Sequence, residues 1–195
     1  MAAYALDDKL GLLTETLAVT GARPSRAVRL RVADLDAHPI RPKLSMPKSA
    51  KGGGRNRAKK KHERYGVPIT APLAAKLKEV AKGRADDAPL LVRRDGTQWD
   101  DNSGQRYDRQ IDKVVIAIGR DPAEVTAYAL RHSSIVRALL LNVPIRLVAS
   151  LHNTSVAMVE RTYSKYITER SDEISRRALL QHEPCVGDNI VALAS

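Results

Sequence analysis

The feature that most constrains this chain is a strongly basic, glycine-containing segment between two short strand-like stretches. From Arg41 to Arg64 the sequence has ten Lys or Arg and a single acid, so this segment carries +9 of the net charge of +11. The triplet Gly52–Gly54 inside it disfavours a continuous helix or strand. The flanking stretches, residues 39–47 and 65–70, partly alternate apolar and polar residues. They predict two antiparallel strands joined by a long basic hairpin loop.

Most of the remaining chain shows helical spacing of apolar residues. Several of the expected boundaries carry Gly, Pro, Ser or Thr, which begin or end helices. Residues 89–93 could form one more short strand. Together these patterns predict an α+β domain that is mainly α, with a small antiparallel sheet. The expected helices cover residues 7–19, 24–30, 71–82, 102–118, 126–141, 144–151, 156–164 and 170–181.

Composition narrows the class of protein further. Only 4% of residues are aromatic and none is Phe, so the core must be aliphatic. The single cysteine, Cys185, excludes an internal disulfide framework and a cysteine-rich zinc site. No apolar run has the length of a membrane span, and the first residues lack the pattern of a signal peptide. We therefore expect a cytoplasmic protein with one domain over residues 1–181 and a tail over 182–195.

The charge predicts the partner better than the fold. A pI of about 10.0 favours nucleic acid first and an anionic membrane surface second. A basic RNA-binding or ribosome-associated protein and a merely solvated loop are alternatives that the charge alone allows. The sequence has no glycine-rich phosphate loop opening a helix, no HExxH and no GxSxG motif. We therefore expect no cofactor and no metal.

An arginine-rich set of motifs remains after these exclusions. TGARPS places Arg23 at the start of a helix, and YALRHSS places Arg131 within a helix, three residues after Tyr128. Each arginine alone is most simply explained by a buried salt bridge. Two guanidinium groups directed at one place would instead bind a phosphate.

In their order, these motifs resemble the catalytic domain of tyrosine recombinases, the phage-type integrases. TGARPSRAVRLRVADL is similar to the first arginine box, and SAKGGG with YGVPIT is similar to the hairpin that carries the catalytic lysine. TAYALRHSS resembles the second arginine box, and TSVAMVERTYSKY resembles the nucleophile segment. The resemblance spans residues 20–166, so it implies a tyrosine recombinase catalytic-domain fold for most of the chain.

The resemblance also implies roles for individual residues. Arg23 and Arg131 match the pair that clamps the scissile phosphate, and Lys51 matches the hairpin lysine. Tyr163 matches the nucleophile, and Tyr166 is a less favoured neighbour. The expected DNA contacts are Arg55, Arg57, Lys59, Lys60, Lys61 and Arg64.

Three positions depart from the family pattern or leave it open. Tyr128 stands where the family usually has the first histidine of its HxxR signature, and Arg26 stands where it often has an acid. The last family position falls on His152 or Asn153. Alignment on TSV indicates Asn153, whereas the stronger donor to a phosphate oxygen would be the imidazole of His152, which we favour.

These assignments imply a site-specific recombinase or integrase that cuts and rejoins DNA through a 3′-phosphotyrosine intermediate. The alternatives are a weak or inactive DNA-binding remnant of the same fold and a relaxing enzyme of the type IB topoisomerase kind. Family members normally have a helical DNA-binding domain before the first arginine box, so we expect this chain to be a fragment or a truncated member. The resemblance implies double-stranded DNA as partner, a homotetramer on DNA when full-length, and a free monomer.

Overall fold

The computed structural model describes residues 2–48, 63–99, 103–168, 175–176 and 179. Within these ranges the chain is mainly helical with one small sheet, as the sequence predicts. A short 3-10 turn, η1 (Val32–Asp34), follows the third helix. The α-helices are α1 (Ala2–Leu6), α2 (Asp8–Thr20), α3 (Pro24–Ala27), α5 (Ala71–Ala81), α6 (Ser103–Ala117), α7 (Tyr128–Leu140), α8 (Ile145–Leu151) and α9 (Val156–Thr168).

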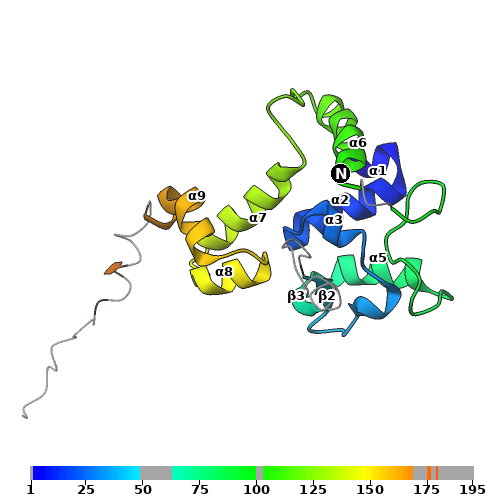
Figure 1. Ribbon diagram of the computed structural model, residues 1–195, viewed down its shortest axis with the longest axis horizontal. Coiled ribbons are helices and arrows are strands. Elements are labelled where there is room, and N and C mark those ends of the chain that lie inside the picture. The colour runs from blue at the N-terminus through cyan, green and yellow to red at the C-terminus, as the bar shows by residue number, and fades with distance from the viewer. Residues whose placement is uncertain (1, 49–62, 100–102, 169–174, 177–178, 180–195) are drawn as a thin grey trace, which may run out of the picture.

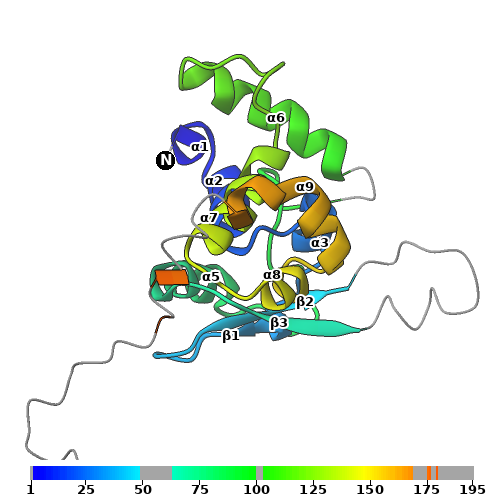
Figure 2. The same cartoon turned by 90° about the vertical axis from the view of Figure 1, so that its left-hand side faces the viewer.

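The sheet has three antiparallel strands in the order β1 (Leu35–Asp36), β2 (Lys43–Pro47) and β3 (Arg64–Pro68). Pro47 pairs with Arg64, so the basic connection between β2 and β3 leaves from that end of the strands. Figure 2 shows the sheet beneath the helices, with α5 and α8 next to it. The predicted strand pair is thus confirmed. Strand β1 was not predicted, because two residues are too few to show an alternating pattern.

Several element predictions need correction. The stretch 89–93 forms isolated bridges from Pro89 to Arg31 and from Val92 to Gln98 in place of a strand. Helix α7 begins at Tyr128, two residues later than the expected start at Thr126. Most of the expected helix 170–181 and all of the expected tail 182–195 lie outside the described residues.

Helix α2 is the central element because it is buried on nearly every side. The Asp7 carboxylate caps its first turn by accepting from the Leu10 amide at 2.8 Å. Gly21 ends it in the left-handed conformation, with φ of 61°, and returns its amide to the Leu17 carbonyl. The hydroxyl of Tyr107 on α6 bonds the Thr14 hydroxyl inside this core. Both ends of α2 are therefore fixed by local chemistry, and its last turn leads directly into Arg23.

Buried apolar side chains form two clusters. The N-terminal cluster joins α1, α2, α3, α5, α6 and the sheet, and it is aliphatic apart from Trp99 and Tyr107. The C-terminal cluster joins α7, α8 and α9, which Figure 1 shows gathered on one side of the molecule. Its buried members are Ile135, Leu139, Val148, Ala149, Val159 and Tyr163.

Candidate active site

The first arginine box lies where α2 turns into α3. Arg23 occupies the position before Pro24, whose fixed φ suits the first turn of α3. Its Nε donates to the Tyr128 hydroxyl at 3.2 Å, which joins the N-terminal part of the fold to the start of α7. Tyr128 is 47% exposed, so this contact lies at the surface.

Arg131 on α7 is buried, with 6% of its surface exposed. One guanidinium nitrogen donates to the Gly21 carbonyl and the other to the His152 carbonyl, both at 2.8 Å. Burial and the positive charges of Arg23 and Arg26 lower the pKa of Arg131 to about 10, so it remains charged at neutral pH. The second arginine box thus meets the first, a juxtaposition that the sequence predicts.

Arg26 adds a third guanidinium to this place. It is 3% exposed and donates to the Asn153 carbonyl at 3.5 Å. Burial lowers the pKa of Arg26, and the charge of Arg23 acts in the same direction. Among the described residues, neither Arg23 nor Arg131 pairs with a carboxylate. Within the described part of the chain, a salt bridge therefore does not account for these two arginines, and their position suits a bound anion.

Tyr163 on α9 lies close enough to Arg131 for their charges to interact. Its hydroxyl is 2.6 Å from Nδ1 of His132, and its ring is 5.6 Å from the His132 ring between centroids. Burial raises the pKa of Tyr163, while the positive charge of Arg131 opposes that rise. The sequence interpretation missed His132, although it directly follows Arg131 and lies four residues after Tyr128, a spacing that places both rings on one helix face.

Three solved structures of DNA recombinases share this arrangement of elements. XerA recombinase matches with a TM-score of 0.62 and 18% identity, over 92% of this chain and 60% of that one. The Tn1549 transposon integrase in complex with transposon right end DNA matches with a TM-score of 0.62 and 16% identity, over 90% and 60%. A lambda integrase dimer bound to a COC′ core site gives 0.57 and 18%, over 94% and 47%.

This is the fold of a tyrosine recombinase catalytic domain. The predicted fold and the structural resemblance are confirmed. The chain covers less than two thirds of each of these recombinase structures. No protein-family model and no curated protein matches the sequence.

Within the recombinase fold, His152 follows α8 and is buried. Its Nδ1 lies 2.8 Å from the Val148 carbonyl, and because a carbonyl only accepts, Nδ1 carries the proton. Its Nε2 then accepts from the Ser134 hydroxyl at 3.0 Å. Both ring nitrogens therefore have internal partners, whereas we expected His152 to donate to a phosphate. The neighbouring Asn153 has a positive φ of 45°.

The other predicted site residues have partners of their own or are not described. Tyr166 packs against the C-terminal cluster, with the Lys165 ammonium 4.7 Å from its ring centroid. Arg64, which we expected to contact DNA, forms an ion pair with Asp34 at 2.9 Å within the fold. The residues outside the described part of the chain are Lys51, Arg55, Arg57, Lys59, Lys60 and Lys61.

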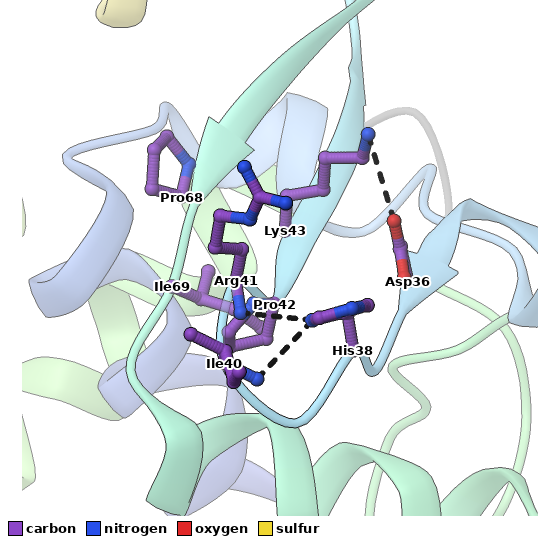
Figure 3. A pocket seen from close by; sticks show the side chains of 8 residues that line it. All are labelled: Asp36, His38, Ile40, Arg41, Pro42, Lys43, Pro68 and Ile69. Atoms are coloured by element: carbon purple, nitrogen blue, oxygen red, sulfur yellow. Dashed lines mark hydrogen bonds and ion pairs between the residues drawn. The ribbon is translucent and has the colours of Figure 1, made fainter.

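The described surface has a hollow of about 560 Å³ at the opposite end of the sheet from the basic connection. Figure 3 shows His38 within it, accepting from the amides of Ile40 and Arg41. The Lys43 ammonium pairs with Asp36 at 3.5 Å across the same hollow. None of the predicted site residues lines it, so the arrangement of arginines, not this hollow, identifies the candidate active site.

The described residues contain no group of three or more His, Cys, Asp or Glu side chains that could hold a metal ion. Among the described helices, none is both long and apolar enough to cross a membrane.

Proposed function

We propose that this chain cuts and rejoins DNA through a covalent bond between Tyr163 and a 3′-phosphate. The observation that carries the proposal is that Arg131 lies close enough to both Arg23 and Tyr163 for their charges to interact. A phosphodiester repels a nucleophile until its negative charge is offset, and the two guanidinium groups supply that charge. Their remaining N–H groups are suited to phosphate oxygens.

In the proposed reaction, Tyr163 attacks phosphorus and displaces the 5′ sugar oxygen. Lys51 is the proposed acid that protonates this leaving oxygen. The phosphotyrosine preserves the energy of the broken bond, so rejoining needs neither a nucleotide nor a metal. Tyr128 contributes a hydroxyl next to Arg23 where the family has an imidazole.

Double-stranded DNA is the proposed partner, bound first through its backbone. The basic segment between β2 and β3 carries the charge for this contact. Changing Lys59, Lys60 and Lys61 together to Gln should weaken binding to all duplex sequences alike and flatten its salt dependence. An unchanged salt slope would rule out backbone contact by these three lysines.

Covalent trapping tests the cutting reaction. The wild-type chain is incubated with nicked duplexes that have randomised arms around one scissile step, and adducts are separated under denaturing conditions. We expect an adduct that maps to Tyr163, that is absent in Tyr163→Phe and that persists in Tyr166→Phe. An adduct on Tyr166 would contradict the assignment of the nucleophile.

A DNA-binding remnant without activity is the second candidate, favoured by Tyr163 being only 6% exposed. It predicts duplex binding with no adduct, identical for wild type and Tyr163→Phe. If adducts form, a comparison of strand exchange between two duplexes with relaxation of a supercoiled plasmid separates a recombinase from a relaxing topoisomerase.

A further inference from the structure

The Tyr163 hydroxyl must lose its proton to become a nucleophile, and the proposed reaction so far names no group that takes it. A phenol is a weak nucleophile at neutral pH, and here burial raises the pKa of Tyr163 further. A proton acceptor within hydrogen-bond reach is therefore required. At 2.6 Å, Nδ1 of His132 meets this distance.

The other two candidate positions do not offer an imidazole to Tyr163. Position 128 carries a phenol, whose hydroxyl already accepts from Arg23. The ring of His152 is engaged by Val148 and Ser134 at both nitrogens. His132 differs from His152 in being exposed, and its ring is near the phenols of both Tyr128 and Tyr163.

We propose that His132 is the general base that activates Tyr163; this inference rests on the proposed function. In the neutral ring the proton sits on Nε2, so Nδ1 accepts from the phenol. As Tyr163 Oη bonds to phosphorus, its proton moves to Nδ1. The bond from phosphorus to the 5′ oxygen breaks, the electron pair leaves with that oxygen, and the acid assigned to Lys51 protonates it. In rejoining, His132 returns the proton to Tyr163.

The surroundings of His132 favour this role. Its ring centroid also lies 6.1 Å from that of Tyr128. Tyr128 is itself bonded to Arg23, one of the proposed phosphate ligands. The imidazolium formed in the reaction would therefore lie next to the bound phosphate anion, which stabilises its charge. The residue after the second arginine thus supplies the imidazole that position 128 lacks.

Single-turnover adduct formation by the full chain tests the proposal, using the randomised nicked duplex pool. His132→Asn keeps a polar group near the Nδ1 position but cannot take the proton, so we expect adducts to form about 100-fold more slowly. The matched control is His38→Asn, an exposed histidine outside the site, for which we expect the wild-type rate. His132→Ala should be equally slow and should recover when imidazole is added.

A leaving group that needs no proton separates the two ends of the reaction. With sulfur in place of the 5′ bridging oxygen, the ratio of wild-type to His132→Asn rates should remain about 100. If His132→Asn cleaves the sulfur-substituted substrate at the wild-type rate, the proposal is overturned, because His132 would then act on the leaving group. A wild-type rate in His132→Asn would overturn it as well.

Two further measurements keep the outcomes distinct. Imidazole nitrogen NMR of the free protein should show the Nδ1 resonance of His132 shifting in Tyr163→Phe, and an unmoved resonance would contradict the contact. If the wild-type chain itself forms no adduct, the proposed function fails and takes this inference with it. If wild type and His132→Asn form adducts equally, only the role of His132 fails.

Discussion

The two apolar clusters differ in how they are built and in what they contribute to the site. The N-terminal cluster combines five helices with a sheet, and it supplies Arg23 and Arg26 from one turn of chain. The C-terminal cluster is three helices around six buried side chains, and it supplies Arg131 and Tyr163. Neither cluster contains the candidate site alone.

Several polar contacts cross the junction of the clusters. Arg131 reaches the Gly21 carbonyl, Arg137 reaches the Ala18 carbonyl at 3.3 Å, and Arg26 reaches the Asn153 carbonyl. The same guanidinium groups that suit a phosphate therefore also join the two parts of the fold. The contacts that assemble the candidate site are therefore also contacts that hold the two parts of the fold together.

The largest effect should come from Gly21→Ala, which blocks this junction. Gly21 has a φ of 61°, and an added Cβ would lie 2.5 Å from Nε2 of His152 and 2.7 Å from the Ser134 hydroxyl. Backbone strain and the forced displacement together should cost about 3 kcal/mol or more of unfolding free energy, measured in urea. Gly83→Ala is the control, because its φ is 72° but nothing lies within 4 Å of the added Cβ. A loss of about 1–2 kcal/mol is expected there, and equal losses would contradict a tight junction.

Arg131→Lys should have the next largest effect. Lysine keeps the positive charge, but one ammonium cannot span the carbonyls of Gly21 and His152. A buried carbonyl left unpaired costs about 1–3 kcal/mol, so urea unfolding should show a loss in that range, and adduct formation should fall as well. Arg137→Lys changes an exposed bond across the same junction and should cost less than about 0.5 kcal/mol. Similar losses in both variants would show that burial of Arg131 is unimportant.

The third prediction concerns pH and His152. Burial lowers the pKa of His152. The hydrogen bond to the Val148 carbonyl raises this pKa, whereas the positive charges of Arg131 and Arg137 lower it further. Below the ordinary histidine pKa, the unfolded chain binds a proton that the folded protein does not, so stability is lost as pH falls. Unfolding free energy should decrease between about pH 7 and 5 by at most about 1.4 kcal/mol per pH unit. His152→Asn should flatten this slope, and an unchanged slope would place the titrating group elsewhere.

The sequence predicted those parts of the fold that local signals determine. Apolar spacing and caps gave α2 and α5 within one residue at each end, and Pro144 correctly marked the start of α8. The sequence could not predict β1, because its two residues show no alternating pattern, nor that residues 89–93 form only isolated bridges. Both outcomes depend on which backbone segment packs next to these residues in the folded protein.

The candidate site was predictable in its residue types and less so in its contacts. Family order placed Arg23 and Arg131 at one point, and the structure brings them together. Sequence spacing could not distinguish His132 from His152, because their difference is burial and the direction of the ring. The partner of Arg64 was equally invisible, since Asp34 lies thirty residues away in sequence.

The smallest effect should come from Tyr128→Phe, which removes an exposed contact across the junction. The Arg23 bond to the Tyr128 hydroxyl is exposed, so its loss should change the unfolding free energy by less than about 0.5 kcal/mol. Tyr4→Phe is the comparison within one cluster, because the Tyr4 hydroxyl bonds the Glu15 carboxylate at 2.5 Å and should cost about 1.5 kcal/mol or more. Duplex binding should weaken about threefold in Tyr128→Phe and stay unchanged in Tyr4→Phe. A large stability loss in Tyr128→Phe would mean that the exposed bond between Arg23 and Tyr128 holds the two clusters together as strongly as the buried bonds of Arg131 do.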